Sequence, residues 1–353
     1  MKNILKIEGR QIKEYGNPFI IAEAGVNHNQ RLDYALQLID IAANAGADAV
    51  KFQTFKAEQV VTEIGEMAEY QKRNLGVVEG QIDMLRKLEL PESFYPKIIK
   101  RCKEKHILFL STPHGGKSSV DFLEKFGVQA YKIGSGDLTN YILLNRVAKT
   151  GKPIILSSGM ATMKEVKAAI NFIKSKKNKQ IAVLHCTTNY PCPPEEVNLS
   201  AMQGMMKLLD IPVGYSDHTN GVQTAIMAAT MGMALYECHF TIDKNLPGPD
   251  HIASCTPDEL KERVQAVRLA SVILGSSKKV PNKSESESML ELTRRSVVAA
   301  HDLKAGHIVA EEDLEAKRPG NGISPARYEI FIGKTLKHSL RRDQQLQFSD
   351  ISK

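Results

Sequence analysis

Side chains suited to binding a metal ion or a small anion recur at the ends of eight short apolar runs in this chain. His218 and His239 close the last two runs, and neutral imidazole is a common ligand of divalent first-row metals. Two histidines leave coordination positions for water and substrate oxygens, which is typical of a Lewis-acid site rather than a closed structural site. The alternative is that one or both only form hydrogen bonds at strand ends, and spacing alone leaves both interpretations open.

Two lysines, Lys51 and Lys132, end the second and fourth runs. A buried ammonium group is costly unless it is paired or faces an opening. Hydroxyl side chains end neighbouring runs, at Thr112, Ser135 and Ser158. Together these groups predict a cradle for a phosphorylated or carboxylated ligand. The alternative for Lys51 is an internal ion pair with Glu23, which ends the first run and is itself suited to acid–base chemistry or to binding sugar hydroxyls.

Further polar residues follow the same rule. Alternation along a strand puts Gln53 on the same face as Lys51. Tyr190 and Ser216 lie where the sixth and seventh runs end, and Asp250 lies in the loop after the eighth run. An aspartate beside proline and glycine usually forms a turn, so Asp250 has a structural interpretation as well.

The elements that must position these side chains are eight apolar runs, and amphipathic stretches of helical length separate most of them. The runs are Phe19–Gly25, Asp48–Thr54, Ile107–Pro113, Gln129–Asp137, Pro153–Met160, Gln180–Pro191, Pro212–His218 and Ala234–Phe240. Eight strand–helix units predict an α/β fold, a (β/α)8 TIM barrel whose active site lies at the carboxyl ends of its strands.

The predicted domains are a barrel over residues 1–275, a linker over 276–292 and a small β-rich unit over 293–353. Residues 1–17 predict a hairpin that caps the bottom of the barrel. The long connection from Lys56 to His106 is typical of a functional segment or a lid. In the tail, residues 302–314 resemble residues 339–351, which indicates two similar half-units.

The composition excludes some classes of protein. The net charge of +7 comes from basic residues spread along all 353 positions, whereas a nucleic-acid surface concentrates them on one face. Five cysteines without a C-x-x-C pair indicate reduced thiols, so we expect a cytoplasmic protein. No signal peptide and no membrane span are expected.

The chain resembles the sialic acid (nonulosonic acid) synthase family over its whole length. The matching segments, in order, are IAEAGVNHN, GADAVKFQT, STP, KIGSGD, LSSGM, HCTTNYP, GYSDHT, ECHFT, LPGPDH and KRPGNGI. The tail resembles the antifreeze-like (SAF) domain of that family. The resemblance implies an enzyme that condenses phosphoenolpyruvate with an N-acylated mannosamine-type sugar. The products are a nine-carbon 2-keto sugar acid and phosphate.

The resemblance also implies roles for individual residues. His218 and His239 would hold a Mn²⁺-like divalent ion, with Glu237 near that metal or its water. Phosphoenolpyruvate would be held by Lys51, Thr112, Lys132, Ser135, Ser158 and Ser216. The sugar would be held by Glu23, Gln53, Tyr190 and Asp250. Arg318 would reach into the partner's barrel in a domain-swapped homodimer. Glu23, Lys51 and Glu237 are the implied catalytic residues.

Four positions depart from the family pattern. Thr188 stands where the family often has Asn, and Asn189 follows it, so either residue is a candidate for that role. His114 and Gln30 stand where Phe and Gly are common, and we expect His114 to tune the preference for the sugar. Ser158 replaces a common Thr and keeps the hydroxyl.

The segments KFQTF, AEYQK, HCTTNYP and NLPGPDH resemble most the branch that makes N,N'-diacetyllegionaminate from 2,4-diacetamido-2,4,6-trideoxymannose. N-acetylneuraminate synthase, using N-acetylmannosamine, is the first alternative, and pseudaminate synthase is the second. Two other classes remain: a barrel enzyme that condenses phosphoenolpyruvate with an aldose phosphate, and a non-catalytic carbohydrate-binding protein. The retained histidines and lysines argue against the last of these.

Overall fold

The computed structural model describes residues 4–67, 72 and 80–352. The chain divides into two compact units, Met1–Gly275 and Ser276–Lys353. The first unit contains all eight apolar runs, and the second contains the internal repeat of the tail.

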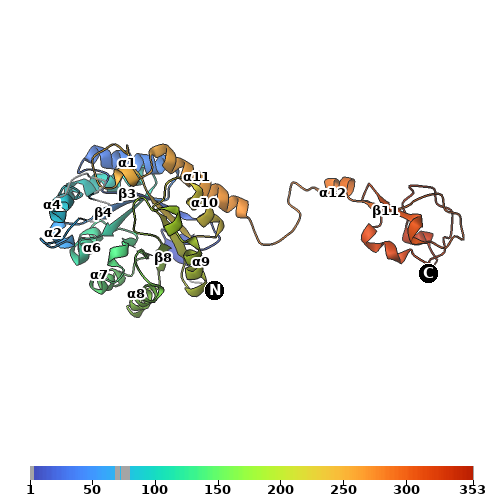
Figure 1. Cartoon of the computed structure of the whole chain (residues 1–353), viewed down its shortest axis with the longest axis horizontal. Helices are drawn as coiled ribbons and strands as arrows, with labels where there is room; N and C mark the ends of the chain where they lie inside the picture. Colours follow the sequence, from blue (N-terminus) through green and yellow to red (C-terminus); the bar gives the residue numbers. More distant parts are fainter. Residues whose placement is uncertain (1–3, 68–71, 73–79, 353) are drawn as a thin grey trace. The chain divides into compact units, whose positions relative to one another are not determined.

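Eight parallel strands form the barrel sheet of the first unit, which confirms the predicted fold class (Figure 1). Their order from edge to edge is β5-β4-β3-β10-β9-β8-β7-β6, and the edge strands β5 and β6 contact each other at a seam where no ladder joins these two described strands. The strands are β3 Phe19–Gly25, β4 Ala49–Thr54, β5 Leu108–Pro113, β6 Tyr131–Ile133, β7 Ile154–Ser157, β8 Ile181–His185, β9 Val213–Asp217 and β10 Leu235–His239.

The register of this sheet sets the polar residues side by side at one end. His239 pairs with Glu23, Glu23 with Lys51, and Glu237 with Ser216. Because all strands run in the same direction, their carboxyl ends meet on one rim of the barrel. The sheet therefore gathers side chains that lie far apart in the sequence.

Helices cover the outside of the barrel. They are α1 Leu32–Ala45, α5 Tyr95–Glu104, α6 Gly116–Glu124, α7 Tyr141–Ala148, α8 Met163–Ser175, α9 Leu199–Leu208, α10 Gln223–Thr230 and α11 Pro257–Leu274. In α1 the buried residues Ala35, Leu38, Ile39 and Ala42 follow the helical period, and Gly46 ends the helix with φ 85°. Capping boxes start α8 and α11 at their threonine N-caps.

The expected hairpin closes the barrel at the amino ends of its strands. Strands β1 (Leu5–Ile7) and β2 (Arg10–Ile12) pair antiparallel around Gly9, which has φ 76°. Their apolar side chains are buried against the first residues of the barrel strands, among them Phe19 and Leu235. The opposite end of the barrel is the one that carries the polar residues.

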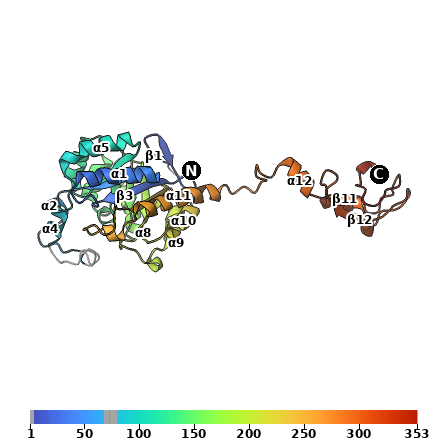
Figure 2. The same ribbon diagram turned by 90° about the horizontal axis from the view of Figure 1, so that it is seen from above.

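Among its described residues, the long connection between β4 and β5 includes the short helices α2 (Ala57–Val60) and α4 (Gln81–Arg86), which lie side by side ahead of α5 (Figure 2). Most of the AEYQK segment lies outside the described residues. A separate apolar cluster joins this connection to the end of β3, through Val26, Phe55, Met67, Met84 and Leu88.

The second unit is small and rich in turns. Helix α12 (Glu287–Thr293) precedes an antiparallel pair, β11 (Ser296–Ala299) and β12 (Leu314–Lys317). The half-units of the repeat pair with each other through bridges such as Leu303–Leu340. Each half holds a histidine–aspartate contact, His301–Asp313 at 3.1 Å in the first and His338–Asp350 at 2.8 Å in the second. Equivalent residues of the two contacts lie 37 positions apart in the sequence.

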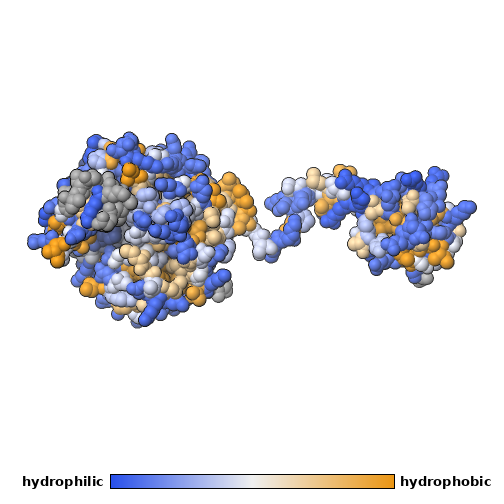
Figure 3. All heavy atoms as spheres, viewed as in Figure 1, coloured by the Kyte–Doolittle hydropathy of each residue, from blue (hydrophilic) through white to orange (hydrophobic). Residues whose placement is uncertain are grey.

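The view in Figure 3 shows hydrophilic residues over much of both units, with apolar residues in smaller groups. Exposed apolar side chains gather near the end of α11, at Leu269, Val272 and Ile273. Among the helices of the described residues, none combines the length and apolar character needed to cross a membrane.

Candidate active site

The carboxyl ends of the eight strands surround a cavity of about 450 Å³. The predicted residues that line it are Glu23, Lys51, Gln53, Thr112, Lys132, Ser135, Tyr190, Ser216, His218, Glu237, His239 and Asp250. A larger cavity of about 610 Å³ lies at the opposite end of the barrel beside the hairpin, and its lining includes none of these residues. Chemistry rather than size therefore identifies the site.

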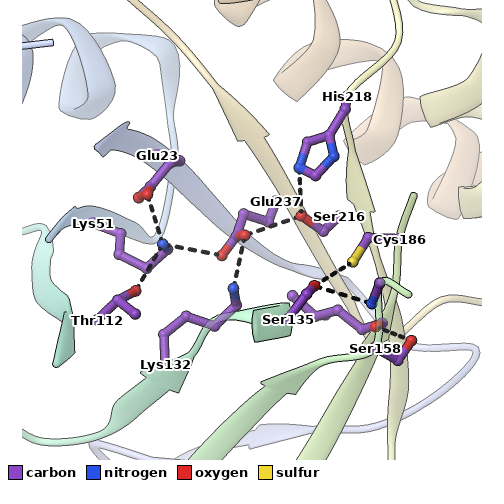
Figure 4. Close-up of polar contacts among 12 residues, drawn as sticks. Glu23, Lys51, Thr112, Lys132, Ser135, Ser158, Cys186, Ser216, His218 and Glu237 are labelled. Carbon is purple, nitrogen blue, oxygen red and sulfur yellow. Dashed lines mark hydrogen bonds and ion pairs between the residues drawn. The ribbon is translucent and has the colours of Figure 1, made fainter. Parts of the chain in front are cut away.

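Two lysines and two glutamates form a buried cluster at the floor of the cavity (Figure 4). Lys51 Nζ lies 2.8 Å from Glu23 Oε1, 3.9 Å from Glu237 Oε2 and 3.1 Å from Thr112 Oγ1. Lys132 Nζ lies 3.1 Å from Glu237 Oε1. The predicted Lys51–Glu23 ion pair is thus present, and it faces the cavity. Two positive and two negative side chains give this cluster no net formal charge.

Burial and ion pairing act against each other in this cluster. For Glu237, burial favours a higher pKa, but the ammonium groups of Lys132 and Lys51 outweigh it and hold the pKa at about 2. For Lys51, burial favours a lower pKa, but the two glutamates outweigh it and raise the pKa. For Lys132 burial dominates, and its pKa is lowered despite Glu237. Glu237 is therefore ionised at neutral pH.

The two predicted metal ligands, His218 and His239, lie with their ring centroids 5.5 Å apart. Tyr190 packs against both rings, at 4.1 and 5.4 Å. His218 Nδ1 lies 2.6 Å from the Thr187 carbonyl oxygen, so it carries the proton and donates it there, and Nε2 keeps its lone pair. Burial, first of all, lowers the pKa of His218 to about 4 and that of His239 to about 3.

This pair fits a divalent metal in its donor chemistry. Both imidazoles are neutral at pH 7, which is the form that binds metals. His239 Nδ1 and Glu237 Oε2 are buried without a hydrogen-bond partner. Within the described part of the chain, no group of three or more His, Cys, Asp or Glu residues is arranged to hold a metal. A metal here would therefore take two histidines and complete its coordination with water or substrate oxygens.

Hydroxyl groups line the side of the cavity formed by β6 to β9. Ser135 Oγ accepts a hydrogen bond from the Gly159 amide at 3.0 Å and lies 3.2 Å from Cys186 Sγ. Ser216 Oγ donates to Glu237 Oε1 at 3.0 Å. Hydroxyl and amide donors of this kind suit the oxygens of a phosphate or carboxylate.

The structure distinguishes the two candidates at the departure in HCTTNYP. Thr188 lines the cavity, and its hydroxyl oxygen is buried without a hydrogen-bond partner. Asn189 instead donates from its amide to Glu196 on the exposed side, at 3.4 Å. Of these two residues, Thr188 is the one that faces the cavity.

One predicted residue of the first unit, Ser158, does not line the cavity. Ser158 Oγ donates to the Leu184 carbonyl at 2.8 Å, and its neighbour Ser157 lines the cavity instead. Arg318 belongs to the second unit. Ser157 is the last residue of β7 and Ser158 follows it, and the apolar pattern of that run does not resolve which of the two serines lines the cavity.

Glu23, Gln53 and Asp250 form the side of the cavity next to β3. Gln53 Nε2 donates to Glu23 Oε1 at 3.2 Å. Burial, and then the charge of Glu23, raise the pKa of Asp250 to about 7. Asp250 therefore titrates near neutral pH at the wall of the cavity.

A buried network behind the rim holds β9 and β10 in place. Asp217, between two cavity residues of β9, accepts a hydrogen bond from the Tyr236 hydroxyl at 2.9 Å and forms an ion pair with Arg263 at 3.1 Å. Arg263, on α11, also donates to the Thr219 carbonyl at 2.6 Å. The residue types alone did not indicate this network, because its members come from three separate elements.

Other lining residues carry no motif that sequence reasoning could use. Cys186 and Met160 line the cavity as isolated side chains, and further lining residues come from α4. His114 lines the cavity, and its Nδ1 is 3.3 Å from Asp137 Oδ2. An imidazole held by a carboxylate is a polar replacement for the usual Phe.

Comparison with known proteins agrees with this geometry. The model of the NeuB family matches residues 38–279, and that of the SAF domain matches residues 294–352. N,N'-diacetyllegionaminic acid synthases from Campylobacter jejuni and Legionella pneumophila are 44% and 42% identical, covering 93% and 94% of this chain and 98% and 94% of theirs. A solved N-acetylneuraminic acid synthetase from Leptospira borgpetersenii superposes with a TM-score of 0.73 at 33% identity, over 82% of this chain and 96% of that one. Pseudaminic acid synthases and a human N-acetylneuraminate-9-phosphate synthase are more distant.

Proposed function

The chain belongs to the NeuB family, and from this premise we propose that it makes N,N'-diacetyllegionaminate and phosphate. Its substrates are phosphoenolpyruvate and 2,4-diacetamido-2,4,6-trideoxymannose. The observation that carries the proposal is the buried cluster of Lys51, Glu23, Glu237 and Lys132 beside two neutral histidines, in one cavity at the carboxyl ends of the barrel strands. The similarity to legionaminic acid synthases supports this product over the alternatives.

We assign phosphoenolpyruvate to the side of the cavity formed by β4 to β9. The hydroxyl groups of Thr112, Ser135 and Ser216 face it, and Thr188 adds an unpartnered hydroxyl. The ammonium groups of Lys51 and Lys132 lie below them. These groups fix the orientation of the anion and so reduce the entropic cost of bringing the two substrates together. Ser158 does not line the cavity, because its hydroxyl donates to the Leu184 carbonyl, so we assign it no direct contact with phosphoenolpyruvate.

We assign the acceptor to the side formed by Glu23, Gln53, Tyr190 and Asp250. His218 and His239 would hold a divalent cation, Mn²⁺ in the first instance, next to its aldehyde. Such a cation supplies Lewis-acid polarisation of the carbonyl oxygen when bound. Tyr190 packs against both imidazoles and restricts their orientation.

The reaction joins C3 of phosphoenolpyruvate to the aldehyde carbon of the sugar. The electron pair of the enol double bond forms the new C–C bond, the π electrons of the aldehyde C=O bond move to its oxygen to give an alkoxide, and C2 becomes electron-deficient. Water adds to C2 and gives up one proton, which the new alkoxide takes up, and the Glu237 carboxylate would orient that water by accepting a hydrogen bond from it. The tetrahedral adduct then loses phosphate by breaking the bond between C2 and the bridging oxygen, which leaves the 2-keto group.

An isotope experiment tests this course of reaction. Phosphoenolpyruvate labelled with ¹⁸O at the bridging position is turned over with the acceptor and Mn²⁺, and the released phosphate is analysed by mass spectrometry. We expect the label in the phosphate, because the C–O bond breaks. Unlabelled phosphate would show P–O cleavage and would rule out this mechanism.

We further propose that the enzyme works as a domain-swapped homodimer in which Arg318 completes the partner's acceptor site. The support is the match of the tail to the SAF domain and the KRPG segment that carries Arg318. A cytoplasmic location is also proposed. Its support is that all five cysteines are unpaired, which suits a reducing compartment.

A further inference from the structure

One side of the cavity differs in character from the rest because it is apolar. Val26 follows β3, and Met84, Leu85 and Leu88 come from α4 and the turn after it. We call these four residues the apolar wall. Val26, Met84 and Leu88 are 4%, 2% and 7% exposed, and Leu85 packs against them. The wall is therefore a fixed, packed surface and not a set of single side chains.

The apolar wall adjoins the groups assigned to the acceptor. Ala24 and Gly25 separate Glu23 from Val26 in the sequence. A Cβ atom on Gly25 would lie 3.5 Å from both Gln53 Nε2 and Glu23 Oε1. The same atom would lie 3.8 Å from Asp250 Oδ2. A sugar held by these polar groups therefore has the apolar wall as its next neighbour.

Among the described residues, the cations near the apolar wall are already engaged. Arg86 on α4 lies 2.7 Å from Glu58 and 2.9 Å from Asp83, and its side chain is half exposed. The lysines among the described lining residues, Lys51 and Lys132, lie on β4 and β6 and are paired with glutamates. Within the described lining, a phosphate or hydroxyl group placed against the wall would give up its hydration without gaining a charged partner.

We propose that the apolar wall selects the acceptor by its C6 end, accepting a deoxy methyl group and disfavouring a hydroxymethyl or phosphorylated one. This inference rests on the proposed function and names the part of the acceptor sugar that the cavity recognises. Burial of a methyl group against packed Leu, Met and Val side chains is favourable, whereas burial of an unpaired hydroxyl is not. Differences of one such group change kcat/KM by roughly 10- to 100-fold in apolar pockets.

The test compares two acceptors that differ only at C6: 2,4-diacetamido-2,4,6-trideoxymannose and its 6-hydroxy analogue. The quantity measured is the ratio of their kcat/KM values, from phosphate release with Mn²⁺ and phosphoenolpyruvate. For Leu85→Gln, which adds an amide at the wall, we expect this ratio to fall about tenfold, with the KM for phosphoenolpyruvate unchanged. Leu85→Met keeps the wall apolar and should keep the ratio.

Ile82→Gln is the matched control, since Ile82 lies on the same helix outside the cavity lining. It receives the same substitution and should leave the ratio at the wild-type value. An unchanged ratio in Leu85→Gln, with activity retained, overturns the proposal. If Leu85→Gln does not fold, Leu85→Thr, which brings a smaller polar group to the wall, replaces it, and an unchanged ratio there overturns the proposal equally. Absence of phosphate release with either sugar in the wild type would instead defeat the proposed function itself.

Discussion

At the scale of single residues, the cavity keeps its charges in compensating pairs. Lys51 and Lys132 are matched by Glu23 and Glu237, and the two histidines are neutral. An anionic substrate therefore gains little from the formal charge of these six side chains. A divalent cation between the histidines would make the cavity positive, which links metal binding to the binding of phosphoenolpyruvate.

The metal proposal is tested by His239→Ala. Removing one of two imidazole donors should weaken Mn²⁺ binding by at least about tenfold and abolish turnover, as measured by calorimetric titration and phosphate release. His114→Ala removes the other cavity histidine of the described lining and should leave Mn²⁺ affinity unchanged. Equal Mn²⁺ affinity in wild type and His239→Ala would refute the assignment of this ligand.

Asp250 gives the cavity a pH dependence of known sign. Its pKa is raised from 3.8 to about 7, so the folded protein binds its proton more tightly than the unfolded chain does. The contribution to stability is present below the unfolded value and is lost as pH rises through about 7. Asp250→Asn is neutral at every pH.

We therefore expect the melting temperature of Asp250→Asn to fall less than that of the wild type between about pH 5 and about pH 8. Differential scanning calorimetry at both pH values measures this. Comparison between the two proteins cancels the titration of all other groups. Parallel pH profiles would show that Asp250 is not buried as an acid in solution.

Residue types predicted much of this site, but not the direction of each side chain. Glu23, Lys51 and His239 could be predicted from strand ends and alternation. An inward-facing charged or polar side chain in a barrel is costly unless it is paired or faces the cavity, so such residues indicate a site. Ser158 and Thr188 show the limit. Both follow the last residues of strands, where the two-residue alternation of a strand no longer decides which side chain faces the cavity.

At the scale of elements, α11 does more than cover the barrel. Arg263 reaches from this helix to Asp217 and the Thr219 carbonyl, and so fixes the ends of β9 and β10 that carry Ser216, His218 and Glu237. The Asp217 side chain is fully buried. Removing only its cationic partner leaves an uncompensated charge, which typically costs about 3–5 kcal/mol.

We expect Arg263→Met to lower thermal stability and, in the protein that remains folded, to weaken Mn²⁺ binding. Arg268→Met is the matched control, because Arg268 lies on the same helix but pairs with Asp48 near the amino ends of the strands. The control should lose some stability and keep its Mn²⁺ affinity. Equal Mn²⁺ affinities in the two variants would mean that Arg263 has only a structural role.

The helices were less predictable than the strands. The apolar runs located all eight strands because a buried parallel strand needs continuous apolar sequence. Helix α9 was not predicted, since its amphipathic signal is carried largely by methionines and interrupted by Gly204. Contacts with β8 and β9 stabilise it, and such tertiary contacts are not visible in a local pattern. Helix α12 was likewise hidden within a polar, linker-like sequence.

At the scale of the whole molecule, the account requires a second copy of the chain. Arg318 lies in the second unit, and its proposed role is in the acceptor site of a partner's barrel. Arg318→Ala should therefore cut turnover strongly without changing the circular dichroism of the protein. Mixed with Glu23→Ala, which is inactive for a different reason, it should recover activity as mixed dimers pair one intact barrel with one intact tail.

One outcome of the mixing experiment would contradict the proposal. If the two variants exchange subunits, as seen by native mass spectrometry, and activity does not return, the swapped-arginine proposal is wrong. Each variant remixed with itself provides the baseline.

The most direct measurement is phosphate release from phosphoenolpyruvate with Mn²⁺ and three acceptors in parallel. These are 2,4-diacetamido-2,4,6-trideoxymannose, N-acetylmannosamine and N-acetylmannosamine 6-phosphate. We predict the fastest release with the first sugar, slower release with the second and none above background with the third. No release with any sugar at confirmed metal loading, or release with the phosphorylated sugar alone, would contradict the account.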